Sequence, residues 1–273
     1  MLKICFLWWW GRAQEIAPNW RDGLRGALEE LGKKHKVDIY LGEIEPLDKY
    51  DFILFWGDSN CPFFEHLDKY SAKKGIILTT DPHNIDNLRK LDVVFCESQP
   101  IYDAVRVHGL RAVKAFGTDT DFYSPGEDVM FTIRDIEYFY PATFSPWKRQ
   151  SAIAYLGNKL VCVGTVQPDG IKEYEVCKQS GVQIMEGYFP PENIRECYAR
   201  AKFVPIPAIH GSERTVLEAM SMNILPTVNP ENKRTISYVE EFIKSGCFTP
   251  REFVLKNYSH KTYADKILEA IER

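Results

Sequence analysis

The chain has 273 residues, 45% of them hydrophobic, and a formal net charge of -4. This length exceeds what most single cores hold and predicts two domains of ordinary size. Because there is no global basic field, we do not expect nonspecific binding to nucleic acid or anionic membranes. Seven cysteines without a CxxC pair indicate reduced core thiols. The opening apolar run is too short to cross a bilayer, so we expect a cytoplasmic protein with at most peripheral membrane contact.

In the N-terminal half, short apolar runs alternate with amphipathic helical stretches, a pattern typical of parallel strands joined by helices. The first helix is marked by Trp20, Leu24, Leu28 and Leu31 on one face, and Gly32 is placed to end it. The predicted strands cover residues 3–9, 37–41, 52–56, 75–79, 93–96 and 112–116. We therefore predict a Rossmann-like domain over residues 1–120.

From Gly117 to Asp128 the sequence is rich in Asp, Thr, Ser, Pro and Gly, as expected of a linker. The strands predicted after it cover residues 138–143, 160–163, 183–186, 203–206 and 225–228, with helices over 194–201 and 214–222. We predict a second Rossmann-like domain over 121–258 and a C-terminal helix over 259–273 that packs back toward the first domain. The predicted fold class is α/β, with two domains facing across a cleft that binds ligand at the carboxyl ends of parallel strands.

The stretch from Ile209 to Val228 predicts a loop, a short helix with one acidic residue, and a buried strand. Helix N-termini carry the positive end of the helix dipole, so a loop entering this helix suits a phosphate group. Glu218 would lie about one turn further in, where its carboxylate could accept hydrogen bonds from ribose hydroxyls. This combination indicates a nucleotide-sugar site.

Two segments carry a resemblance to a known family. Residues 92–125, DVVFCESQPIYDAVRVHGLRAVKAFGTDTDFYSP, and residues 187–228, GYFPPENIRECYARAKFVPIPAIHGSERTVLEAMSMNILPTV, resemble blocks of the GT-B glycosyltransferases. The likeness is to the large retaining group that resembles glycogen synthase and the bacterial mannosyltransferases. It implies a GT-B fold, a UDP- or GDP-linked sugar as donor, and retention of anomeric configuration, with no cofactor beyond that substrate.

The resemblance implies roles for residues of the second half. Glu218 matches a ribose-binding Glu, and Lys148 falls where the family has a Lys that neutralises the donor diphosphate. Arg149 could exchange duties with Lys148. The backbone at Gly187 and Tyr188 would lie near the base. The loop amides on the diphosphate would be those of Gly211, Ser212, Glu213, Arg214 and Thr215.

Several of these positions depart from the family pattern. His210 stands eight residues before Glu218, where the family has another Glu, and Glu213 replaces that Glu only if the loop is re-registered. Thr143 stands five positions before Lys148, where the family has an Arg. The first departure removes a carboxylate that would contact the donor sugar ring. The second removes a positive charge that would face the diphosphate.

In the first half, Gly11 is what remains of a Gly-rich turn that the family places against acceptor and diphosphate. His83 follows the fourth predicted strand, where many relatives have a His near the reacting sugar carbon. By this resemblance, His83 and Lys148 are the predicted catalytic residues.

Plainer interpretations exist for each residue. Glu218 could be a helix-surface acid, Lys148 a solvated lysine, and His83 a loop residue whose hydrogen bonds are satisfied within the protein.

In the run of tryptophans from 8 to 10, Trp8 is expected in the core and the later ones at the cleft mouth. The sequence Asp119–Asp121 imitates a metal-binding DxD motif but lies in the linker, where it is typical of a turn. We therefore predict no essential metal.

The combined interpretation is a metal-independent, retaining glycosyltransferase. It would move a sugar from a nucleotide-diphosphate donor to a glycan, lipid, protein or small-molecule acceptor. The departures at His210 and Thr143 leave open a catalytically inactive protein that binds nucleotide sugars. In a third interpretation the acceptor is a modified DNA base, as in some viral GT-B enzymes. The net negative charge of the chain argues against nucleic-acid binding.

Overall fold

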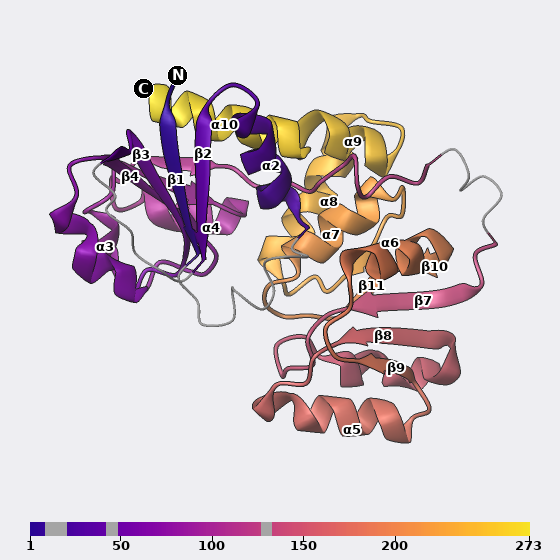
Figure 1. Cartoon of the computed structure of the whole chain (residues 1–273). Helices are drawn as coiled ribbons and strands as arrows, with labels where there is room; N and C mark the ends of the chain where they lie inside the picture. Colours follow the sequence, from indigo (N-terminus) through magenta and orange to yellow (C-terminus); the bar gives the residue numbers. More distant parts are fainter. Residues whose placement is uncertain (9–20, 42–48, 127–132) are drawn as a thin grey trace. The chain divides into compact units, whose positions relative to one another are not determined.

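The computed structural model describes residues 1–8, 21–41, 49–126 and 133–273. It divides into two compact units, one formed by Met1–Gly117 with His260–Arg273 and the other by Thr118–Ser259 (Figure 1). Each unit contains parallel strands joined by helices, as predicted. Within the described ranges, every helix is too short or too polar to cross a membrane.

The first unit contains a six-stranded parallel sheet in the order β2-β1-β3-β4-β5-β6. Its strands are β1 (Lys3–Trp8), β2 (Lys36–Leu41), β3 (Phe52–Gly57), β4 (Lys73–Leu78), β5 (Val93–Cys96) and β6 (Ala112–Lys114). Its helices are α2 (Gly23–Gly32), the 3-10 helix η3 (Pro62–Lys69), α3 (Ile85–Leu88), α4 (Gln99–Arg106) and α10 (His260–Glu272). All six strands were predicted, with each end displaced by at most two residues.

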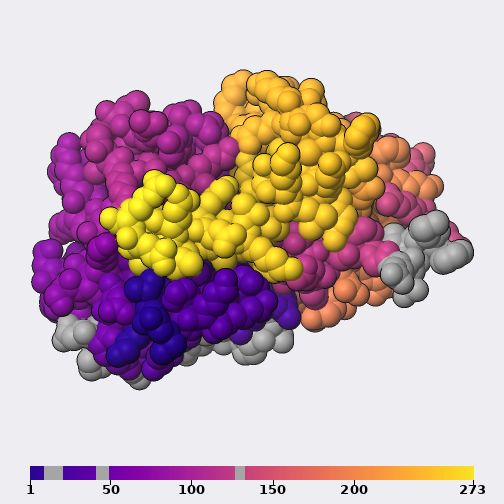
Figure 2. All heavy atoms as spheres, turned by 90° about the horizontal axis from the view of Figure 1, so that it is seen from above, coloured from indigo at the N-terminus to yellow at the C-terminus, as the bar shows by residue number. Residues whose placement is uncertain are grey.

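Helices cover both faces of this sheet, because successive strand residues point to opposite sides. On one side Phe6 and Leu54 pack against α2 and α10, and on the other Leu7 and Phe55 pack against η3, α3 and α4. Burial on both faces explains why the strands are continuous apolar runs rather than alternating ones. Figure 2 shows α10, in yellow, beside the indigo N-terminal segment. The prediction that the C-terminal helix packs on the first half is confirmed.

Replacing Ile267 in α10 with Ala should lower the free energy of unfolding by about 2–5 kcal/mol, because the side chain is fully buried between α10 and the sheet. Chemical denaturation followed by circular dichroism would measure the change. Asp265→Ala, at an exposed position of the same helix, is the matched control and should have little effect. Equal losses in the two variants would contradict this packing.

The second unit contains a four-stranded parallel sheet in the order β10-β7-β8-β9 and a separate parallel pair, β11-β12. The strands are β7 (Ile136–Pro141), β8 (Leu160–Gly164), β9 (Gln183–Glu186), β10 (Ala201–Phe203), β11 (Pro205–Ile206) and β12 (Thr227–Val228). The helices are the 3-10 helices η5 (Gln150–Lys159) and η6 (Pro168–Gly170), and α5 (Ile171–Gln179), α6 (Pro191–Arg200), α7 (Glu213–Ser221), α8 (Lys233–Ser245) and α9 (Pro250–Asn257).

The predicted strand over 203–206 is wrong in one respect, because the structure divides it between two sheets. β10 pairs with β7, whereas β11 pairs with β12. The change of partner occurs at Val204, whose carbonyl already accepts the amide of Thr227 at 3.0 Å. Pro205 has no N–H with which to continue the first ladder. The division directs the chain after β11 into the loop that precedes α7.

Candidate functional site

The predicted donor residues of the second unit follow the carboxyl ends of its parallel strands. Lys148 and Arg149 come after β7, Gly187 and Tyr188 after β9, and the loop to α7 after β11. β7 and β9 belong to one parallel sheet, whose carboxyl ends share the edge where α/β folds bind ligands. The loop after β11 meets the segment after β7, because the Ile209 amide donates to the Trp147 carbonyl at 2.9 Å. The topology therefore gathers segments that are far apart in the sequence.

The ammonium of Lys148 contacts the loop that precedes α7. Its Nζ donates to Ser212 Oγ at 2.9 Å and to the carbonyl of His210 at 3.3 Å. Glycine suits position 211 because the backbone has a φ of +70°, and a Cβ there would lie 2.7 Å from Nζ, so that the lysine side chain would have to move. The structure thus brings together four of the predicted residues: Lys148, His210, Gly211 and Ser212.

Ser212 combines backbone strain with an unusual cap. It has a φ of 75°, in the left-handed region that non-glycine residues rarely adopt. As the N-cap residue of α7 its hydroxyl would ordinarily accept from a first-turn amide, but no such bond forms. The hydroxyl instead accepts from Lys148 and lies 3.5 Å from Tyr140 Oη. The Ser212 side chain therefore does not cap the first turn of α7.

The side chain of Glu213 is committed to another residue of the protein. Its carboxylate forms an ion pair with Nε of Arg234, and the two side chains are 5% and 7% exposed. Arg234 NH1 also lies 3.2 Å from His210 Nε2. A buried carboxylate needs such a partner, because an uncompensated charge in this environment is strongly unfavourable. Ligand contact through the Glu213 side chain stays a prediction.

Glu218 lies inside the unit rather than on a helix surface, since its residue exposure is 5%. The surface interpretation is therefore wrong. The hydroxyl of Tyr198 donates to Glu218 Oε2 at 3.1 Å. Burial raises the pKa of Tyr198 well above its ordinary value, and the Glu218 charge raises it further, so this phenol stays protonated as a donor. Its ring packs edge-on against Phe139 and Tyr123, with centroids 5.0 and 6.1 Å away.

The remaining predicted residues of this unit lie on the same loops and on the first turn of α7. Arg149, with a φ of 51°, places NH1 3.7 Å from a carboxylate oxygen of Glu231. Thr215 is buried and its hydroxyl donates to a β7 carbonyl at 3.3 Å. Arg214 is exposed on the first turn of α7, and Tyr188 is 52% exposed. Gly187 has a φ of 120° and its amide donates to the last residue of β8 at 3.1 Å.

In the first unit, His83 lies at the carboxyl edge of the sheet, after β4. The side chain is exposed, and its backbone amide donates to Ser59 Oγ at 3.0 Å. Trp8 packs against the core with Trp56, at a centroid distance of 5.4 Å, which confirms its core assignment. Gly11 and the two later tryptophans lie outside the described residues.

Sequence reasoning missed two residues at the start of α8. Asn232 caps this helix through Oδ1, and its Nδ2 donates to the carbonyls of Ala208 and Gly211 at 3.2 and 3.0 Å. Arg234, two residues on, contacts His210 and Glu213. An Asn just after a strand and before a helical run is a recognisable N-cap signal. The signal predicts a helix start, but no sequence pattern says that the helix start reaches the loop.

The DxD-like sequence forms a turn. Asp119 Oδ1 accepts from the amides of Asp121 and Phe122 at 3.2 and 3.0 Å, which is the behaviour of an Asx turn. Among the residues that the structure describes, no group of three or more His, Cys, Asp or Glu side chains could hold a metal ion.

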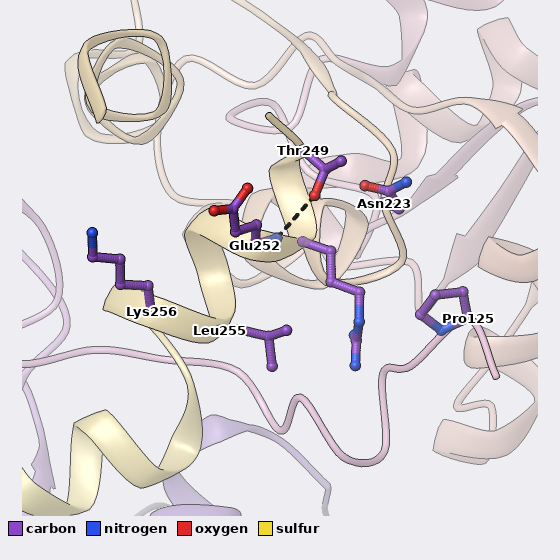
Figure 3. A pocket seen from close by; sticks show the side chains of 7 residues that line it. Pro125, Asn223, Thr249, Glu252, Leu255 and Lys256 are labelled. Carbon is purple, nitrogen blue, oxygen red and sulfur yellow. Dashed lines mark hydrogen bonds between the residues drawn. The ribbon is translucent and has the colours of Figure 1, made fainter. Parts of the chain in front are cut away.

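A hollow of about 560 Å³ lies elsewhere in the second unit (Figure 3). It is lined by Pro125, Asn223, Thr249, Arg251, Glu252, Leu255 and Lys256. Asn223 follows the C-terminal end of α7, so this hollow lies at the opposite end of the helix from Ser212. Three of its polar side chains are engaged within the protein: Thr249 accepts the Glu252 amide, Glu252 accepts the Phe248 amide, and Arg251 donates to backbone carbonyls. We therefore place the candidate site at the strand ends.

Solved structures share the architecture of the chain. AviGT4, a glycosyltransferase involved in avilamycin A biosynthesis, is 14% identical, with a TM-score of 0.63 over 100% of this chain and 98% of that one. TarM from S. aureus is 13% identical over 81% of this chain and 55% of its own, with a TM-score of 0.56. A trehalose-phosphate synthase (UDP-forming) from Burkholderia xenovorans is 9% identical over 91% and 77%, with a TM-score of 0.53.

No protein-family model matches the sequence, and no curated protein matches it significantly. The likeness of this chain to known proteins is therefore one of structure. At these identities the likeness establishes architecture, and the chain has the fold of the GT-B glycosyltransferases.

Replacing Tyr198 with Phe should lower the free energy of unfolding by about 1–3 kcal/mol, because the buried Glu218 carboxylate loses a donor. Urea denaturation would measure the loss. Tyr155→Phe is the matched control, since Tyr155 is 81% exposed and should be insensitive to loss of its hydroxyl. A Tyr198→Phe protein as stable as the control would show that this hydrogen bond contributes nothing.

Proposed function

We propose that the protein is a glycosyltransferase that moves a sugar from a nucleotide-diphosphate donor to an acceptor. The observation that carries the proposal is the placement of Lys148 against the strained turn at the N-terminus of α7. This arrangement offers a diphosphate both a cation and the positive end of a helix dipole. The structural neighbours support it, since TarM was solved with UDP and the trehalose-phosphate synthase is UDP-forming.

The donor would be distributed along the strand ends of the second unit. The diphosphate would lie against Lys148 and the amides at the start of α7, and Glu218 would face the ribose hydroxyls. The base would approach the backbone at Gly187 and Tyr188. Tyr198 holds Glu218 in place through its 3.1 Å hydrogen bond, so the carboxylate needs little reorganisation on binding.

The chemistry follows from where charge develops. When the bond between the anomeric carbon and the phosphate oxygen breaks, negative charge grows on the departing diphosphate. A pre-placed ammonium and helix terminus stabilise that charge more in the transition state than in the ground state. The proposed mechanism is therefore independent of a metal ion, because Lys148 and α7 supply the positive charge at the diphosphate.

We infer retention of anomeric configuration from the family resemblance. In this reaction the departing phosphate oxygen accepts the proton of the acceptor hydroxyl while that hydroxyl attacks the same face of the sugar. His83 would orient the sugar or the acceptor rather than act as the base. Its backbone is held by Ser59, while its side chain is exposed. The acceptor class, whether glycan, lipid, protein or small molecule, has to come from screening.

Lys148→Ala should lower kcat about 100- to 1000-fold, as expected for loss of one pre-placed group that stabilises developing charge. Donor consumption with UDP- and GDP-sugars, across an acceptor panel and in water alone, measures the effect. Lys172→Ala, at an exposed position of α5, is the control. Unaltered turnover in the Lys148 variant would show that this residue has no part in the mechanism. If the wild type binds nucleotide but turns over no donor, the protein is an inactive nucleotide-sugar binding protein.

Glu218→Ala should abolish much of the thermal stabilisation that UDP or GDP gives the wild type, because a ligand bound only by the folded state raises stability by mass action. Each variant is compared with its own melting temperature without nucleotide, so that the stability cost of the substitution is separated from binding. Glu192→Ala, exposed on α6, serves as the control. A shift as large as that of wild type would place the nucleotide elsewhere.

A further inference from the structure

The start of α8 holds the loop before α7 through both backbone and side chains. Asn232 Nδ2 donates to the carbonyls of Ala208 and Gly211. Arg234 contacts the side chains of His210 and Glu213, the residues on either side of Gly211 and Ser212. Asn232 contacts the loop backbone, whereas Arg234 contacts side chains, so the Arg234 contacts bear on the state and orientation of the His210 ring.

The chemistry of the Arg234 contact determines the tautomer of His210. A guanidinium has only N–H donors and no acceptor, and Arg234 NH1 lies 3.2 Å from His210 Nε2. Nε2 must therefore accept, which leaves the imidazole neutral with its hydrogen on Nδ1. A proton on Nε2 would point directly at the guanidinium hydrogens and would repel them.

Burial makes this contact durable. The Arg234 and Glu213 side chains are 7% and 5% exposed, and their ion pair compensates each charge where water cannot. A guanidinium fixed in this way cannot turn to another partner without leaving Glu213 uncompensated. The geometry at His210 is thus set by a buried ion pair rather than by a mobile surface residue.

We propose that Arg234 is a positioning residue that holds His210 as the neutral Nδ1–H tautomer, and that His210 in this form donates a hydrogen bond to an oxygen of the donor's sugar diphosphate. The second clause rests on the proposed function. The residue lies beside the proposed position of the diphosphate, because its carbonyl accepts from the Lys148 ammonium at 3.3 Å. A neutral ring adds a donor beside that cation without adding a second positive charge.

The tautomer is tested by nitrogen NMR of the full chain labelled at histidine, without nucleotide. The signal of His210 among the six histidines is identified by its loss in His210→Asn. We expect an unprotonated Nε2 and a protonated Nδ1 near neutral pH. Arg234→Lys should preserve this state, because an ammonium also only donates.

A paired replacement tests the role of Arg234 without stranding a buried charge. Arg234→Met combined with Glu213→Gln removes both members of the ion pair, and the His210 ring should then populate both tautomers. Calorimetric titration with UDP- and GDP-sugars should show about 3- to 10-fold weaker binding, the equivalent of one ordinary hydrogen bond. Lys233→Met, at the neighbouring exposed position, should bind as the wild type does.

A double-mutant cycle separates positioning from general loosening. In a His210→Ala background the paired replacement should cause no further loss of binding, because the group that it positions is already gone. If the wild type binds nucleotide sugar but has a proton on Nε2, the inference about Arg234 and His210 fails while the proposed function stands. Additive losses in the cycle would have the same consequence. Failure of the wild type to bind any nucleotide sugar would overturn the proposed function and the ligand contact together, while the tautomer would still be decided by NMR.

Discussion

The contact between the Lys148 ammonium and the turn at Gly211 and Ser212 places a positive charge at the positive end of the α7 dipole. By itself this placement is unfavourable, because cations are stabilised at helix C-termini and anions at N-termini. The turn is also strained, with the Ser212 backbone in the left-handed region. The electrostatic cost falls when an anion lies between the ammonium and the helix. Under the proposed function, the donor diphosphate would occupy this position.

In the contacts named above, Lys148 and the acidic residue nearest to it in the first turn of α7 have different partners. Glu213 is the acidic residue of the first turn of α7, and its carboxylate pairs with Arg234. Lys148 instead contacts a hydroxyl and a carbonyl, two uncharged oxygens. These contacts orient the ammonium toward the loop that precedes α7. Arg234 thus serves the site twice, by engaging the nearby carboxylate and by fixing the state of His210.

The sequence predicted the elements better than it predicted the contacts between them. The strands of the first unit were recognisable because both sheet faces are covered, which makes each strand an apolar run. The meeting of Lys148 with the α7 loop followed from the resemblance and from the rule of strand ends, although 64 positions separate Lys148 from Ser212. The strand break at Pro205 and the pairing of His210 with Arg234, 24 positions away, depend on tertiary packing that no local pattern encodes.

The two ends of α7 show why the open hollow and the candidate site differ in chemistry. The helix has nine residues, so its ends are about 13 Å apart. At the C-terminal end Arg251 donates to the Ser221 carbonyl at 2.7 Å, where the dipole favours a cation. At the N-terminal end the cation opposes the dipole, and the Ser212 side chain does not cap the helix. Under the proposed function the cation at this end faces the donor diphosphate, whereas Arg251 binds backbone carbonyls at the other end.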